Sequence, residues 1–271
     1  MANPEPDPTP IGGVSPQGWY EAPRPSAPER DTPPTRLAPG GPRWGLGDAA
    51  LGWLLGQIGG LLTVSFVLAA GGYSVDEFDE LPLGLIVLGQ VGLWAGLLGV
   101  PLVVSRTKGN GLVSDFGLTV RRTDPLVGGL WGFLTQFPII PLLYWPIVQL
   151  ANVDVDDLSA PARELTDRAV DPFGVVMLVV FVGIAAPIVE EIFYRGLLQR
   201  SLARRFGPTL AVIGTAVIFG VSHMQLLQLP ALVVAGLVFG ILAQRSGRLG
   251  PPIAAHIVFN MVTVVSLVAL D

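Results

Sequence analysis

Long apolar stretches separated by short polar segments dominate the chain after residue 43. A transmembrane helix needs about 20 mainly apolar residues to cross a hydrocarbon core about 30 Å thick. Seven stretches approach or exceed that length, so we predict seven spans, at about 49–72, 82–105, 126–151, 173–199, 208–228, 230–244 and 250–270. The fifth and sixth are short and nearly contiguous, which indicates a tight hairpin at Gln228–Pro230 or a re-entrant pair. The predicted fold is all-α, a polytopic transmembrane helical bundle.

The first 43 residues follow a different pattern, in which prolines recur and large aliphatic side chains are few. Such a segment buries too little apolar surface to offset the ordering of its backbone. We therefore expect 1–43 to be a disordered cytoplasmic tail and 44–271 to be the transmembrane domain. The tail lacks the apolar core and basic flank of a signal peptide, so we do not expect its removal. Its prolines suit a partner that recognises polyproline II.

Composition supports the membrane interpretation, because 51% of the residues are hydrophobic and only 14% are charged. A soluble domain carries roughly 25% charged residues. The absence of cysteine excludes disulfides, cysteine-bound zinc and a thiol nucleophile. No basic stripe of the kind that follows nucleic acid is present, so we expect no nucleic-acid partner. Heavy use of Ala, Gly, Pro, Val and Arg, with Lys108 the single lysine, indicates a GC-rich genome and a bacterial plasma membrane.

The basic residues predict an orientation, because Lys and Arg accumulate in short cytoplasmic loops. They concentrate in the tail and in the segments between spans two and three, four and five, and six and seven. The acidic runs Asp76–Glu80 and Asp154–Asp157 fall on the other side. We expect a cytoplasmic N-terminus and an external C-terminus. Glycine pairs four residues apart predict close helix packing, at Gly52/Gly56/Gly60, Gly92/Gly96, Gly128/Gly132 and Gly236/Gly240.

The fourth span runs without a charge from Phe173 to Val189 and then ends in Glu190, Glu191 and Arg195. An ionisable side chain in the bilayer needs a partner or a function. Glu191 and Arg195 are i,i+4 neighbours, whereas Glu190 points about 100° away around the helix. We assign Glu191 to a structural pair with Arg195, and Glu190 to the role of general base. The alternative is that the helix has simply reached the headgroup region.

Both histidines of the chain, His223 and His256, fall inside apolar stretches. Phe219 lies one turn before His223 and can shield its imidazole from lipid, and Asn260 lies one turn after His256 on the same face. Each histidine could instead be a satisfied core residue, and Asn260 could be a hydrogen-bonding link between helices. Their position in the same third of the chain as Glu190 favours a shared site.

A carboxylate, two imidazoles and an amide suit the hydrolysis of an amide bond. Glu190 would remove a proton from water, a histidine would orient that water or protonate the leaving amine, and an amide would donate to the oxyanion. The amide is that of Asn260. Glu190, His223 and His256 are also a possible ligand set for a divalent metal such as zinc. The residue types alone leave both chemistries open.

Three motifs lie in order on successive apolar stretches, namely Glu190-Glu191-x-x-x-Arg195, Phe219-x-x-x-His223 and His256-x-x-x-Asn260. They resemble the CAAX protease and bacteriocin-processing family, which includes the Rce1-type prenyl-protein endopeptidases. The resemblance covers about 172–270, and Tyr194 also fits the first motif. It implies an all-helical intramembrane endopeptidase in which Glu190 and His223 activate water while His256 and Asn260 complete the site. Members of the family are described both as metalloproteases and as metal-independent glutamate proteases.

The resemblance also implies substrates that are membrane-embedded or lipid-anchored proteins or peptides. Two other functions are compatible with polar residues in a membrane. Glu and His mark ion pathways, as in a transporter or proton relay, although the chain shows no internal repeat. A non-catalytic immunity or scaffold protein would use the motifs for packing alone.

The predicted spans also raise a question of depth. If all helices stood upright, the 15 residues from Pro208 to His223 would rise about 22 Å and carry His223 away from Glu190 and His256. We therefore expect strong tilt, a fourth helix that extends to about Arg205, or a re-entrant fifth segment.

Overall fold

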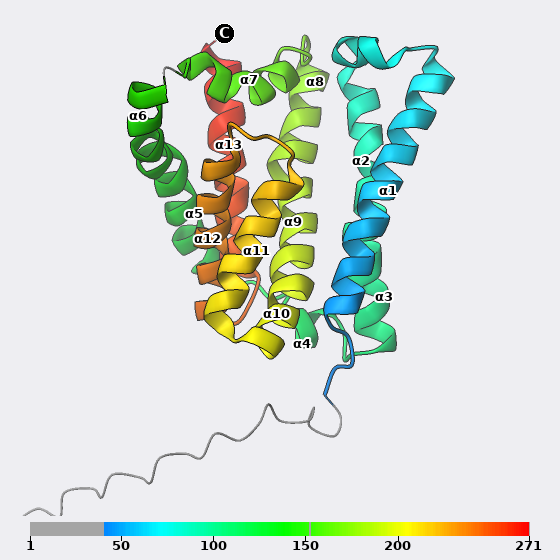
Figure 1. The fold of residues 1–271 in the computed structure, drawn as a ribbon, viewed down its shortest axis with the longest axis vertical. Helices are drawn as coiled ribbons and strands as arrows, with labels where there is room; N and C mark the ends of the chain where they lie inside the picture. The colour runs from blue at the N-terminus through cyan, green and yellow to red at the C-terminus, as the bar shows by residue number, and fades with distance from the viewer. Residues whose placement is uncertain (1–40, 152, 271) are drawn as a thin grey trace, which may run out of the picture. The chain divides into compact units, whose positions relative to one another are not determined.

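The structure is a computed structural model that describes residues 41–151 and 153–270. Within these ranges the chain is helical and contains no strand, which confirms the predicted all-α class (Figure 1). The predicted disordered tail and any partner that it binds fall almost wholly outside the described residues. One compact unit holds residues 39–271.

The helices follow one another with short connections. Their bounds are α1 Leu46–Gly71, the 3-10 turn η1 Val75–Glu80, α2 Leu83–Leu97, α3 Gly99–Thr107, α4 Leu112–Phe116, α5 Asp124–Leu134, the π-helix η2 Thr135–Ile139, α6 Ile140–Ala151, α7 Val155–Thr166, α8 Pro172–Met177, the π-helix η3 Leu178–Ala185, α9 Ala186–Glu191, the π-helix η4 Ile192–Leu198, α10 Gln199–Phe206, α11 Pro208–Ser222, α12 Leu229–Ser246 and α13 Gly250–Leu270. Several of these are segments of one longer helix. The longest, from α8 to α10, has 35 residues.

Six helices among the described residues are long and apolar enough to cross a membrane. They correspond to the predicted spans one to four, six and seven, and the fourth extends to Phe206, close to the bound of about Arg205 that was one of the three expected alternatives. The fifth span is shorter than predicted, because α11 ends at Ser222 rather than near residue 228. Met224, two residues later, has a left-handed backbone with φ 54°, which stops the helix. Figure 1 shows α11 ending partway up the bundle.

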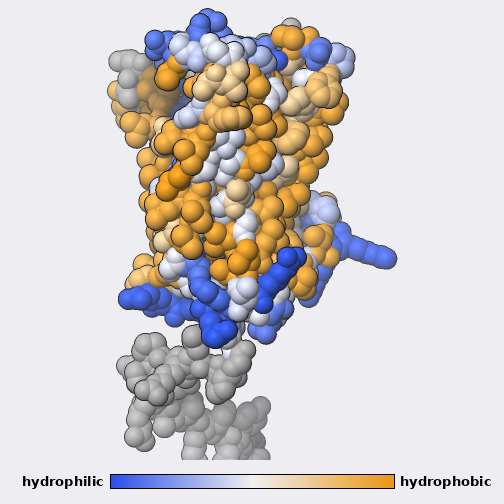
Figure 2. Space-filling model, turned by 90° about the vertical axis from the view of Figure 1, so that its right-hand side faces the viewer, coloured by the Kyte–Doolittle hydropathy of each residue, from blue (hydrophilic) through white to orange (hydrophobic). Residues whose placement is uncertain are grey.

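Apolar side chains cover the outside of the bundle. Leu61, Phe66 and Leu150 are 68%, 70% and 85% exposed. Figure 2 shows one face on which apolar side chains fill the middle, while polar side chains gather at both ends. In water this surface would be costly, and in lipid it is solvated by the acyl chains. The chain is therefore a multi-pass membrane protein.

Close glycine contacts hold pairs of helices together, as the glycine spacing predicts. A Cβ at Gly96 would clash with the backbone nitrogen of Gly56, so α1 and α2 pack backbone against backbone. A Cβ at Gly132 would clash with the carbonyl of Ala255, which places α5 directly against α13. Small residues allow such approach, and the van der Waals contacts that result replace the hydrophobic driving force that lipid removes.

The two ends of the bundle differ. At the end where α1 begins, Lys108 pairs with Asp48, and Arg248 pairs with Asp124. At the other end lies the acidic run Asp154–Asp157, which forms the start of a helix, α7. Its first carboxylate accepts a hydrogen bond from the backbone nitrogen of Asp156 at 3.0 Å and so caps the amphipathic helix α7.

Candidate active site

The two glutamates lie deep in the long fourth span, where α9 passes into the π-helix η4. Glu190 is 18 residues from the start of that span at Pro172 and 16 from its end at Phe206, which correspond to rises of about 27 and 24 Å. This depth argues against the interpretation that the helix has reached the headgroups at Glu190. The Glu191 side chain is fully buried, whereas 18% of the Glu190 side chain is exposed. Neighbouring carboxylates therefore have different surroundings.

Glu191 binds two partners through one oxygen. Its Oε1 accepts a hydrogen bond from Nη1 of Arg195 at 2.6 Å and another from Nδ1 of His256 at 2.9 Å. The i,i+4 pair predicted from the spacing is present. The sequence assigned Glu191 to structure alone, and the structure corrects this, because Glu191 also orients a candidate catalytic imidazole. That contact joins residues 65 positions apart, so no local pattern could have indicated it.

His256 is held between the two carboxylates. A carboxylate accepts hydrogen bonds, so the contact with Glu191 places a proton on Nδ1 and turns Nε2 the other way. Nε2 lies 3.8 Å from Oε2 of Glu190, a close approach that is longer than a hydrogen bond. The His256 ring is buried and stacks on Phe239, with centroids 4.7 Å apart. The bond to Glu191 and the stacking on Phe239 thus fix the direction of the imidazole.

Arg195 is a buried cation rather than a headgroup-facing one. The orientation argument grouped it with the basic loop residues, which the structure corrects, since its side chain is fully buried. Besides its bond to Glu191, Nη2 donates to the carbonyl of Gly236 at 3.2 Å. Its guanidinium carbon lies 4.7 Å from the ring centroid of Phe219 and 5.3 Å from that of Phe239. An ion pair, a backbone carbonyl and two aromatic faces thus compensate its desolvation.

His223 lies at the end of α11, beside this cluster but not bonded to it. Its Nδ1 is 2.8 Å from the carbonyl oxygen of Phe219, which only accepts, so Nδ1 carries a proton. Phe219 packs against both imidazoles, with centroid distances of 4.7 Å to His223 and 5.7 Å to His256. Among the described residues, no hydrogen bond or ion pair joins His223 to Glu190, His256 or Asn260.

Asn260 lies one turn beyond His256 and holds the fourth span. Its Nδ2 donates to the carbonyl of Val182 at 2.9 Å, within the π-helix η3. One amide hydrogen is thereby used, and a second remains on the same nitrogen. The sequence anticipated either interhelical packing or oxyanion binding for this side chain, and the observed bond is of the first kind.

The possible metal ligands do not converge. In the described part of the chain, no three His, Asp or Glu side chains approach closely enough to hold one ion. Of the proposed set, Glu190 and His256 approach to 3.8 Å, while no direct contact of His223 with either is found among the described residues. This arrangement does not fit a metal ion held by Glu190, His223 and His256 together.

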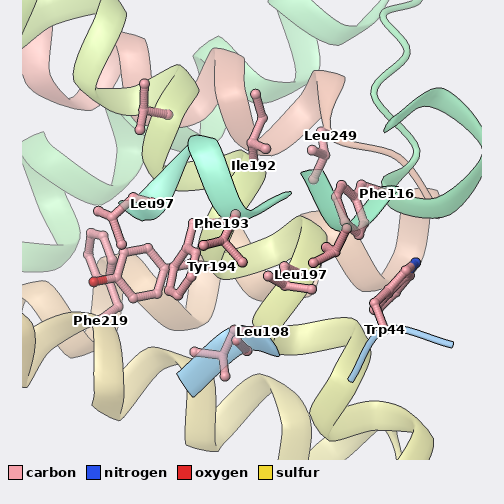
Figure 3. Packing of buried hydrophobic residues seen from close by; sticks show 14 residues of the cluster. Trp44, Leu97, Phe116, Ile192, Phe193, Tyr194, Leu197, Leu198, Phe219 and Leu249 are labelled. Carbon is pink, nitrogen blue, oxygen red and sulfur yellow. The ribbon is translucent and has the colours of Figure 1, made fainter. Parts of the chain in front are cut away.

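An aromatic layer closes the site on one side. Tyr194 packs edge-on against Phe219 with centroids 5.2 Å apart, and Figure 3 shows these two side chains adjacent within the main apolar cluster. Trp53 of α1 donates from Nε1 to Oγ of Ser222 at 2.9 Å, next to His223. The sequence analysis named Tyr194 and Phe219 but missed Trp53 and Phe239, because single aromatics on apolar helices resemble ordinary core.

Side-chain hydrogen bonds to α6 and α7 hold the segment that follows His223. Tyr144 of α6 donates to the carbonyl of Leu227 at 2.6 Å. Nε2 of Gln228 donates to the carbonyls of Asp157 and Leu158 in α7, at 3.1 and 3.2 Å. Helices that lack any site residue therefore hold the segment that follows His223, at positions 227 and 228.

These features describe a multi-pass membrane protein that carries a buried carboxylate–imidazole site. The family model described as "Type II CAAX prenyl endopeptidase Rce1-like" matches residues 172–262. A curated protein of Bacillus subtilis (strain 168), named "Putative membrane peptidase YdiL", is 32% identical over 229 residues. The match covers 79% of this chain and 86% of that protein. No solved structure matches the chain significantly.

The chain belongs to the CAAX protease and bacteriocin-processing family of membrane proteases. The matched region begins at the start of α8 and includes all four candidate catalytic residues, Glu190, His223, His256 and Asn260.

Proposed function

We propose that the chain is an intramembrane endopeptidase in which Glu190 activates the attacking water. One observation carries the proposal. An incompletely buried carboxylate, Glu190, lies 3.8 Å from Nε2 of His256, whose other ring nitrogen is held by Glu191. A carboxylate beside an oriented imidazole, deep in a membrane protein, is suited to moving a proton.

Each of the four candidate catalytic side chains has its own role in the proposed reaction. Water attacks the carbonyl carbon of the peptide bond, and Glu190 takes the proton that this water loses. The bond between carbon and nitrogen then breaks, and the leaving amine receives a proton from Glu190 or from a histidine. His223 does not contact Glu190 directly, and its Nδ1 is bonded to the carbonyl of Phe219. Its Nε2 therefore orients the attacking water or donates a proton to the substrate. The second amide hydrogen of Asn260 donates to the oxyanion.

The proposed substrates are membrane-embedded or lipid-anchored proteins or peptides. A site so far from either end of the long fourth span is reached more readily by a chain already in the membrane. The description of the matching family model also names a prenyl endopeptidase. The proposed steps use the Glu190 carboxylate as the base, and no group of three possible metal ligands is found among the described residues.

We also propose a bacterial plasma membrane with the N-terminus in the cytoplasm. The basis is the cluster of basic residues at the end where α1 begins, where Lys108, Arg204 and Arg248 all contact neighbouring elements. Positive residues favour the cytoplasmic side. A partner for the proline-rich tail remains part of the proposal, on the strength of its sequence alone.

The test is a cleavage assay with purified chain in vesicles that also contain candidate membrane peptides. New peptide termini, identified by mass spectrometry, should appear with the parent chain. They should be lost with His256→Gln and strongly reduced with His223→Gln, by about 10²-fold or more for a residue that transfers a proton. A parent chain that cuts nothing but moves protons or solutes across the same vesicles would support a transporter and contradict the proposal.

A further inference from the structure

A cavity of about 410 Å³ lies at the end of the bundle where α1 begins, on the basic side of the candidate active site. Its lining includes Arg195, Arg200, Arg204 and one acidic residue, Asp115. Arg195 is already neutralised by Glu191, which lies outside the lining. The volume falls within the range of small-molecule sites, roughly 300–1,000 Å³. None of the proposed catalytic steps uses this cavity.

Two of the arginines retain most of their hydrogen-bonding capacity. Arg200 donates from Nη2 to the carbonyl of Gly247 at 2.8 Å, and Arg204 donates from Nη2 to the carbonyl of Trp44. Each guanidinium group has five N–H donors, and within the described ranges each makes this single hydrogen bond. Both side chains are fixed by these anchors, and Arg204 also lies over the Trp44 ring at 3.8 Å.

The acidic residue of the lining is turned toward other partners. Oδ2 of Asp115 accepts from Nε1 of Trp44 at 3.0 Å and from the backbone nitrogen of Asn110 at 2.8 Å. Its carboxylate keeps its charge and attracts both Arg200 and Arg204, but the two guanidinium groups outnumber it and leave the lining with a net positive charge. Two guanidinium groups that line one cavity offer planar sets of donors, which match the oxygen atoms of a phosphate group.

We propose that this cavity binds a phosphate group at the membrane surface, held by Arg200 and Arg204. α10 is the terminal segment of the fourth span, where lipid headgroups lie, and the volume exceeds what inorganic phosphate alone would need. The exposed neutral residues Asn110, Ser114 and Gln244 of the lining can bind hydroxyl groups attached to the phosphate. A phospholipid headgroup and a soluble phosphate ester share this chemistry.

The experiment separates these two sources. In one arm, the purified full chain is placed in lipid nanodiscs with and without phosphatidylglycerol, and retained lipid is counted by native mass spectrometry. In the other arm, glycerol phosphate is titrated into the full chain in nanodiscs of phosphatidylcholine alone, and the heat of binding is measured by calorimetry. The parent should bind in at least one arm, and Arg200→Gln/Arg204→Gln should lower the affinity in that arm at least tenfold.

A matched control removes the same charge from the same end without touching the cavity. Arg205→Gln/Arg245→Gln replaces two exposed arginines that do not line it, and should bind like the parent. Ala203→Leu keeps every charge but fills the space, and should also lose at least tenfold, which decides the matter if the double arginine variant fails to fold. Absence of binding in both arms, or an equal loss in the control, would overturn the proposal. Glu190→Gln should bind normally, so failure of the peptidase proposal would leave this one standing.

Discussion

At the scale of single residues, the centre of the molecule is the Glu191 carboxylate. It is fully buried and joins a cation from its own helix to an imidazole from α13. Its neighbour Glu190 makes no such bond and keeps some exposure. Glu191 thus holds the site together, and Glu190 is left to carry out the proposed chemistry.

Removing this carboxylate should destabilise the chain strongly. Glu191→Ala would leave the Arg195 guanidinium buried without its counter-charge, at a cost of about 3–5 kcal/mol. Unfolding of the purified protein in detergent, followed against temperature, should show a clear loss of stability. Asp156→Ala is a matched control, because its contact with Arg163 is 3.7 Å long and its carboxylate is 83% exposed. Equal stability of the two variants would contradict the role given to Glu191.

The local part of the site could be predicted from the sequence, and the long-range part could not. Helical periodicity is enough to pair Glu191 with Arg195 and to separate Glu190 from both. The contact of His256 with Glu191 depends on how α13 packs against the fourth span, and apolar stretches do not specify that packing. The bond from Asn260 to Val182 is of the same kind, since it reaches 78 positions along the chain.

At the scale of helices, the bundle depends on small residues and on where helices stop. Hydropathy predicted six spans closely, because length and apolar content are local properties. It overestimated the length of the fifth span. α11 ends at Ser222 because Met224 adopts a left-handed backbone, and Tyr144 holds the following segment through the carbonyl of Leu227. It also missed α7 itself, whose acidic and polar residues read as a loop.

Backbone contact between α1 and α2 gives a prediction at this scale. Gly96→Ala should destabilise the chain by about 1–3 kcal/mol, because the added methyl group meets the backbone of Gly56 and forces the helices apart. This loss should exceed the usual gain in helix propensity on replacing glycine with alanine. Gly99→Ala is the control, with nothing within 4 Å of the added atom, and should be neutral or slightly stabilising. Thermal unfolding of both variants distinguishes the two effects, and a neutral Gly96→Ala would refute the packing account.

At the scale of the whole molecule, the two ends of the bundle carry different charges and should face different compartments. The chain contains no cysteine, so single cysteines can report the orientation without background. Val120 and Val170 are 68% and 89% exposed and flank opposite ends of the described bundle. In intact bacterial cells, an impermeant maleimide should label Val170→Cys and spare Val120→Cys until the membrane is opened. The reverse pattern would show that the basic end faces outward.

The central claim is that Glu190 activates the water that cuts the peptide bond. The most direct measurement is the single-turnover cleavage rate of a responsive membrane peptide by Glu190→Gln in vesicles, against Glu164→Gln. The latter makes the same change at an exposed position on α7. Loss of a general base predicts a rate reduced by about 10²–10⁴-fold for Glu190→Gln, with substrate binding retained and the control unchanged. A Glu190→Gln chain that cuts as fast as its parent would contradict the account.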